Sequence, residues 1–142
     1  MFLKTQTPSE RLAVWRKVRQ HQFDAVDDLL EQFKGIKLES RYLDYYTPSS
    51  WPNPFEIVNE GYFCQSGVTL ILTATLIHQN FISNREICMP VISSNIDGIS
   101  GLVLLDEEKV YNFLPGKVVT LRELEENATI FQVHKIDPDK IF

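Results

Sequence analysis

One segment in the middle of the chain restricts the possible folds more than any other. It reads WPNPFEIVNEGYFC and is followed directly by a long apolar run. Asn53 can cap a helix, Pro54 suits the first helical position, and Glu56 can reach back to the cap amide. Gly61 is a typical helix terminator. The segment therefore predicts a short helix that begins after Asn53 and ends at Gly61, with Cys64 shortly beyond it.

The apolar run extends from Val68 to Ile77 and contains no charged residue. It is the best candidate for the centre of the core. Its threonines, valine and isoleucines favour a strand, and the apolar residues alternate with the threonines as in a strand. Its length and its position after a glycine-bounded turn are also compatible with a buried helix. The residues alone leave both structures open.

Composition predicts an ordinary globular protein of one domain. The chain has 142 residues, of which 44% are hydrophobic and 23% charged. We expect residues 1–35 to form an N-terminal helical segment and residues 36–142 an α+β core. No apolar stretch suits a membrane span or a signal peptide, so we expect a cytoplasmic protein without membrane contact. The two cysteines, Cys64 and Cys88, indicate neither a disulfide scaffold nor a zinc site, and no cofactor motif is present.

Helices are predicted in the first third of the chain. The letters TPSE at the start repeat the pattern of cap, proline and glutamate, and Leu12, Trp15 and Val18 follow at helical spacing. A second apolar stripe runs from Val26 to Phe33 before a terminating glycine. These patterns predict two amphipathic helices.

Strands are predicted in the second half, with a short helix at 120–126. The strand candidates are 86–92, 100–105, 109–113, 117–119 and 129–136. The second and third of these should pair as a hairpin, and Pro90 suggests that the first is an edge strand or contains a bulge. Helices first and strands second indicate an α+β fold with an antiparallel sheet.

Charge is distributed unevenly along the chain. Residues 1–22 contain five basic residues against one glutamate and sum to +4, so the remainder of this chain of net charge −5 sums to −9. A basic helix on an acidic body could attract an acidic protein or nucleic acid. No aromatic residues or glycines for base stacking interleave the basic residues, so we do not expect nucleic acid. Arg16, Lys17 and Arg19 are predicted either to contact a protein partner or to form a solvated face.

Cys64 is the one residue whose setting suggests chemistry. Backbone amides at a helix start can stabilise a thiolate, and a cysteine hydrolase also needs a histidine and a group that orients it. Free cysteines are more often small buried hydrophobic residues. Among the histidines, we expect His21 to be a surface residue, His78 to be a polar cap on the apolar run, and His134 to be packed on the last strand.

The positions of Trp51, Pro54, Glu56, Gly61 and Cys64 resemble the start of the bacterial transglutaminase-like (papain-like) cysteine proteinases. That family has a Trp-x-Thr-Pro-x-Glu segment, a Gly-Asp-Cys turn and a helix that begins at the nucleophilic cysteine. A strand that starts with the catalytic histidine follows, and a paired strand carries Asp and Asn. The resemblance covers about residues 51 to 113. It implies that the apolar run is a helix.

The chain departs from the family pattern at the residues that carry the chemistry. Phe63 replaces the aspartate before the cysteine, and Gln-Ser replaces an acidic pair after it. The histidine position falls at about Ser100, which cannot act as a general base at neutral pH. The orienting position falls at Tyr111 or Asn112. His134 could substitute for the missing histidine only if the last strand lies next to the hairpin.

We therefore expect a non-catalytic protein-interaction or assembly module on a degenerate transglutaminase-like fold. Its binding residues would include the aromatic residues of one loop. Aromatic loop residues are common binding anchors and just as commonly cover the core, so both roles stay open here. These residues are Tyr42, Tyr45, Tyr46 and Trp51. The alternative is a cysteine hydrolase or acyltransferase that uses Cys64 with His134 and Asn112. The short chain also resembles uncharacterised bacteriophage proteins, which implies a virion component or a host factor as the partner, and the virion as a possible location.

Overall fold

The structure is a computed structural model and describes residues 1–82 and 85–140. Helices occupy the first half of the chain and strands most of the second, so the predicted α+β class with an antiparallel sheet is confirmed. The helices are α1 (Pro8–Gln20), α2 (Val26–Glu31), α3 (Pro54–Glu60), α4 (Gln65–His78) and α5 (Leu121–Asn127), with short 3-10 turns η1 (Pro48–Ser50) and η2 (Pro138–Lys140). The strands are β1 (Ile87–Ser94), β2 (Ser100–Leu102), β3 (Leu104–Asp106), β4 (Lys109–Tyr111), β5 (Val118–Thr120) and β6 (Ala128–Ile136).

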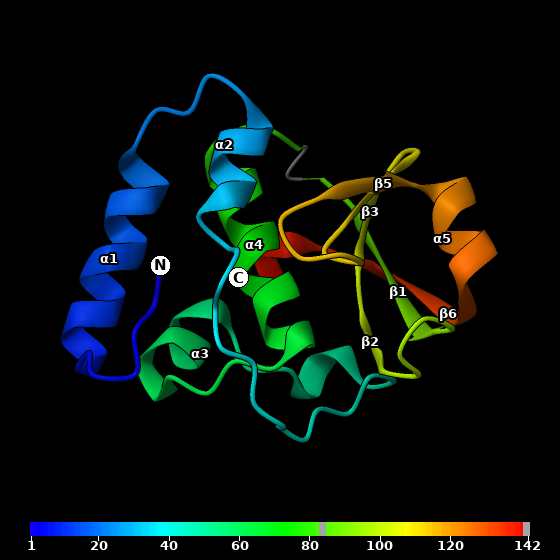
Figure 1. Ribbon diagram of the computed structural model, residues 1–142, viewed down its shortest axis with the longest axis horizontal. Helices are drawn as coiled ribbons and strands as arrows, with labels where there is room; N and C mark the ends of the chain where they lie inside the picture. Colours follow the sequence, from blue (N-terminus) through cyan, green and yellow to red (C-terminus); the bar gives the residue numbers. More distant parts are fainter. Residues whose placement is uncertain (83–84, 141–142) are drawn as a thin grey trace.

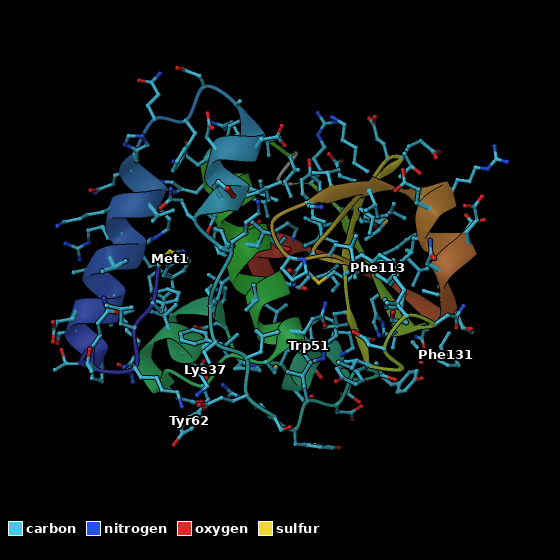
Figure 2. The ribbon with its side chains drawn as sticks, in the orientation of Figure 1. Met1, Lys37, Trp51, Tyr62, Phe113 and Phe131 are labelled. Atoms are coloured by element: carbon cyan, nitrogen blue, oxygen red, sulfur yellow. The ribbon has the colours of Figure 1, made fainter. Side chains whose placement is uncertain are left out.

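Helix α4 lies at the centre of the molecule (Figure 1). In this view α1 and α3 lie on one side of α4, α2 overlaps the upper part of α4, the sheet lies on the other side, and α5 lies beyond the sheet. Figure 2 places Phe113 on the sheet side, towards the centre, and Phe131 near the outer end. Within the described ranges, no helix is both long and apolar enough to cross a membrane.

The uncharged run forms helix α4, as the family resemblance implies and against its strand propensity. Nearly every residue from Ser66 to Leu76 is buried. The threonine hydroxyls are satisfied inside the helix, since Thr73 Oγ1 donates to the Thr69 carbonyl (2.7 Å) and Thr75 Oγ1 to the Ile71 carbonyl (2.8 Å). A poor helix former costs up to about 0.7 kcal/mol, whereas burying one large aliphatic side chain contributes about 1.5–3 kcal/mol. Burial therefore outweighs propensity.

The predicted helix ends are confirmed at three positions. The hydroxyl of Thr7 and the carboxylate of Glu10 form a reciprocal capping box at the start of α1. Asn53 caps α3 through its side-chain oxygen, which accepts a hydrogen bond from the Glu56 amide. Glu56 itself accepts from the Asn53 side-chain amide at 2.7 Å, not from the backbone amide that we expected. Gly61 ends α3 with φ 77°, a left-handed conformation that favours glycine.

Arg11 joins α1 to the end of α3, which the sequence did not predict. The Arg11 side chain is only 8% exposed. Its guanidinium donates to the carbonyls of Val58 (2.8 Å), Asn59 (2.7 Å) and Gln6 (2.7 Å). Two of these carbonyls belong to the last turn of α3, where the helix dipole favours a positive charge. This contact fixes the position of the turn that leads to Cys64.

Strand β1 is the central strand of the sheet. It pairs antiparallel with β6 along one edge, and with both β2 and β3 in one continuous register along the other. At Pro90 we expected either an edge strand or a bulge. The edge strand is wrong, but the pairing of β1 with β6 does shift its register between Val91 and Ile92, one residue beyond Pro90. Pro90 faces Val103, the residue between β2 and β3. The Val103 amide donates a hydrogen bond to the Pro90 carbonyl at 3.2 Å. Because proline has no backbone N–H, it cannot donate a hydrogen bond to the opposite strand, and the ladder between β1 and its neighbour is interrupted there.

The sheet has two buried faces. Leu102 and Leu104 point towards α4, while Val103 between them belongs to a smaller cluster under α5. This alternation is the period of an extended strand. The hairpin of β3 and β4 forms as predicted, with Leu104 opposite Tyr111. The two strands bring the residues after β4 to the first turn of α4, where the candidate site lies.

Candidate functional site

Cys64 occupies the cap position of α4, as the family resemblance implies. Its Sγ accepts a hydrogen bond from the Gly67 amide at 3.3 Å. The side chain is half-buried and forms no disulfide. The sulfur therefore lies where orphan backbone amides of a helix start are concentrated.

An open cavity of about 550 Å³ lies beside Cys64, and we call it the Cys64 cleft. Ser100, at the start of β2, lines this cleft together with Cys64. Tyr42 and Tyr45 line it from the loop before η1, and the Tyr45 hydroxyl donates to the Ser100 carbonyl at 3.3 Å. The histidine position that the family resemblance assigns thus lies in one cleft with the cysteine, and a serine fills it.

Asn112 directly follows β4, with a left-handed φ of 68°. Its side-chain Nδ2 donates to the Gln65 carbonyl (3.1 Å) and to Thr69 Oγ1 (2.8 Å), both in the first turns of α4. The side chain of Gln65 donates in turn to the carbonyls of Leu102 (2.8 Å) and Asn112 (3.1 Å). Asn112 therefore anchors α4 to the hairpin, and its amide nitrogen is not directed at a histidine.

His134 lies on β6, in a different set of contacts. Its Nε2 is 2.6 Å from the Tyr45 carbonyl, and its ring packs edge-to-face on Trp51 at 5.6 Å. A carbonyl can only accept, so Nε2 carries the proton. Among the described residues, no histidine bonds to Cys64 and none lines the Cys64 cleft. The structure thus brings Cys64 and Asn112 to the same end of α4, but it does not bring His134 into that group.

The aromatic loop is divided between surface and core. Tyr42 is 89% exposed and Tyr46 55%, whereas Trp51 is only 7% exposed. Trp51 Nε1 donates to the Asp44 carbonyl at 2.7 Å. Hydrogen bonds from the Thr47 hydroxyl and the Tyr46 amide hold the Asp44 pKa below its usual value. Trp51 thus covers the core, and the tyrosines are the part of this loop that a partner could contact.

The basic residues of α1 also differ in exposure. Arg16 and Lys17 are exposed. The Arg19 guanidinium lies over the Trp15 ring, with Cζ 4.1 Å from its centroid, and over Phe55 at 5.0 Å. Burial and the neighbouring Arg16 lower the Arg19 pKa. Arg19 therefore contributes to the contact between α1 and α3, which leaves Arg16 and Lys17 as the accessible charges.

Two polar residues of the site were missed as functional candidates. Gln65 links α4 to two strands, and the hydroxyl of Ser66 accepts a hydrogen bond from the Leu102 amide at 3.0 Å. The available signal was their position directly after Cys64, where the family has an acidic pair. No group of three or more His, Cys, Asp or Glu side chains suited to a metal occurs within residues 1–82 and 85–140.

Comparison with known proteins identifies the fold. No protein-family model matches the chain, and no curated protein matches it. Calcium-bound LapG of Legionella pneumophila is similar in structure, with TM-score 0.68, 14% identity, and coverage of 92% of this chain and 77% of LapG. Two further LapG structures of the same organism have TM-scores of 0.66 (14% identity, coverage 89% and 75%) and, after EGTA treatment, 0.59 (16%, coverage 87% and 71%). LapG has a transglutaminase-like cysteine protease fold, so the predicted transglutaminase-like α+β fold is confirmed.

Proposed function

We propose that this chain is a non-catalytic protein-interaction module that binds a polypeptide segment in the Cys64 cleft. One observation carries the proposal: Ser100 occupies the expected histidine position in the same cleft as Cys64. A serine hydroxyl cannot take up a proton at neutral pH, so the cysteine has no general base there. The transglutaminase-like fold by itself does not supply an activity without such a site.

The lining of the cleft supports a polypeptide as the ligand. Tyr42 and Tyr45 offer rigid aromatic surface of the kind that anchors protein interfaces. The charged residues of the lining form ion pairs, Glu39 with Lys4 at 2.7 Å and Arg41 Nη2 with Glu60 at 2.8 Å. Arg41 Nη1 is buried without a hydrogen-bond partner among the described residues, so it could still donate to an oxygen of the bound segment. Glu39 has its pKa lowered by the hydrogen bond from Lys4. The cleft therefore suits an uncharged polypeptide segment with aromatic or hydroxyl groups.

The test is selection of peptides from a random display library against the full chain, followed by affinity measurement for the selected peptides. Ser100→Trp should fill the cleft from an exposed position and weaken binding by about tenfold or more. Ser49→Trp is the matched control, because Ser49 is exposed and does not line the cleft. Equal affinities of the two variants would contradict the proposal. Cleavage of the bound peptides, lost in Cys64→Ala, would instead favour the cysteine hydrolase or acyltransferase.

The identity of the partner stays a prediction. The comparisons give no support to a bacteriophage origin, and the proposed binding does not depend on one. Affinity purification of the tagged chain from its native source, repeated with Ser100→Trp, would identify a partner that uses this cleft. A virion component or a host factor recovered only with the unaltered chain would support the assembly role that we expected from the sequence.

A further inference from the structure

A second cavity of about 230 Å³ opens next to the Cys64 cleft, and we call it the inner cavity. Its apolar lining includes Phe33, Ile36, Val68, Ile92, Ile99 and Phe113. Gln65 and Ile99 line both the inner cavity and the Cys64 cleft. A side chain of a polypeptide in the cleft therefore lies within reach of the inner cavity.

Asn112 supplies the inner cavity with an unused hydrogen-bond acceptor. The residue is only 8% exposed and lines the cavity. Its two bonds to α4 fix the orientation of the amide, because the Gln65 carbonyl can only accept and must face Nδ2. Among the described residues, none donates a hydrogen bond to Asn112 Oδ1. Oδ1 is not one of the buried side-chain atoms that lack a partner in the described part of the chain, so water reaches it, and a ligand that brings a donor takes the place of that water.

Size and charge narrow the choice of ligand. A cavity of about 150 Å³ lined by aliphatic and aromatic residues holds benzene, so about 230 Å³ holds one aromatic ring with one or two further atoms. Asp97 is the charged side chain of the lining, and it disfavours an anionic ligand. Its hydrogen bond from the Ile99 amide at 3.0 Å keeps this carboxylate at the turn beside the cavity. An uncharged ring with one hydrogen-bond donor fits these properties.

We propose that the inner cavity binds a tyrosine side chain of the polypeptide held in the Cys64 cleft, with the phenol hydroxyl donating to Asn112 Oδ1. This inference rests on the proposed function and names the residue that the binding site selects. The aliphatic walls bury the ring, and the acceptor distinguishes tyrosine from phenylalanine. Tryptophan also has a hydrogen-bond donor, but its two-ring indole is larger than a cavity that holds one aromatic ring with one or two further atoms.

The direct test uses p-cresol, which is the side chain of tyrosine, and toluene, which is the same molecule without the hydroxyl. Both are titrated into the ¹⁵N-labelled full chain, and the amide signals of Ile99, Gly101 and Phe113 are followed. p-Cresol should bind saturably in about the millimolar range, and toluene about three- to tenfold more weakly. Indole should bind more weakly than p-cresol. Equal affinities of toluene and p-cresol, stronger binding of indole, or no saturable binding of p-cresol would each overturn the proposal.

Two neighbouring isoleucines give a matched pair of variants. Ile99 is 57% exposed and lines the cavity, whereas Ile96 is 63% exposed in the same turn and does not. Ile99→Ala should weaken p-cresol binding by about threefold or more, and Ile96→Ala should leave it unchanged. Val68→Met should fill the cavity and abolish binding. If Val68→Met does not fold, the two isoleucine variants still test the site. Equal affinities of Ile99→Ala and Ile96→Ala for p-cresol would show that p-cresol binds outside the inner cavity.

The peptides selected for the proposed function separate the two proposals. Enrichment of tyrosine among them, and about tenfold loss of affinity on its replacement by phenylalanine, would support both. Peptides that bind in the Cys64 cleft without tyrosine would overturn the inner-cavity assignment and leave the proposed function intact. If p-cresol binds but no peptide is selected, the proposed function fails, and the inner cavity is a site for free phenols instead of for a polypeptide.

Discussion

Replacing Arg11 by methionine is the sharpest perturbation of the contact between α1 and α3. Methionine retains most of the apolar stem and removes the guanidinium with its bonds to Val58, Asn59 and Gln6. A hydrogen bond to a charged group contributes about 1.5–3 kcal/mol, but the cost of burying the guanidinium offsets part of the sum. Arg11 also lines an open cavity of about 450 Å³, so water can reach some of the freed carbonyls.

We therefore expect Arg11→Met to lower the free energy of unfolding by about 2–4 kcal/mol. For a chain of this length, that corresponds to a melting temperature lower by about 6–20 °C. Urea denaturation followed by tryptophan fluorescence measures the change, because Trp15 and Trp51 are both buried in the folded chain.

Arg16→Met is the control, since Arg16 is exposed on the same helix. It should change the free energy of unfolding by less than about 0.5 kcal/mol. If Arg11→Met and Arg16→Met have the same stability, the three hydrogen bonds contribute nothing net, and the view that Arg11 fixes the end of α3 is refuted.

Three further predictions concern individual side chains. Asn53→Ala should lower the free energy of unfolding by about 0.5–2 kcal/mol through loss of the α3 cap; urea denaturation that gives no change would show that the cap bond is dispensable. In a Cys88→Ser background, Cys64 should react with iodoacetamide at pH 6 no faster than a free peptide thiol; faster labelling by mass spectrometry would indicate an activated nucleophile. Burial, with smaller effects from Asp106 and Asp27, raises the Tyr111 pKa above its usual 10.0. The unfolded chain therefore releases this proton first, so stability should fall as the pH rises past about 10, and Tyr111→Phe should remove that loss in denaturation measured at pH 9 and 11.

Much of the local structure could be predicted because it depends on groups only a few residues apart. The capping box of Thr7 and Glu10, the Asn53 cap and the left-handed Gly61 each involve one turn of chain. The hairpin of β3 and β4 likewise follows from two short apolar runs and the turn between them. The position of Cys64 at a helix start followed only from the family resemblance, because the residues alone left the apolar run open between helix and strand.

The candidate site could be predicted only in part. The family resemblance put the histidine position at about Ser100 and the orienting position at Tyr111 or Asn112. The structure has Ser100 in the lining of the Cys64 cleft and bonds Asn112 to the first turns of α4. The contacts of His134 with Tyr45 and Trp51 depend on how β6 lies against a loop far away in the chain. No pattern of neighbouring residues contains that information.

The sequence by itself determined where α1, α3 and α5 begin and where α3 ends, since caps, prolines and glycines act on backbone groups within about four residues of themselves. Tertiary structure decided three other features. The threonine-rich run became α4 because burial on all sides outweighed its strand propensity. Pro90 was accommodated in the central strand because the ladder breaks opposite it at Val103. Arg11 was drawn into the interior because three carbonyls, two of them at the end of α3, converge on it from outside its own helix. In each case the deciding partner lies outside the local segment, where only the folded chain brings it into contact.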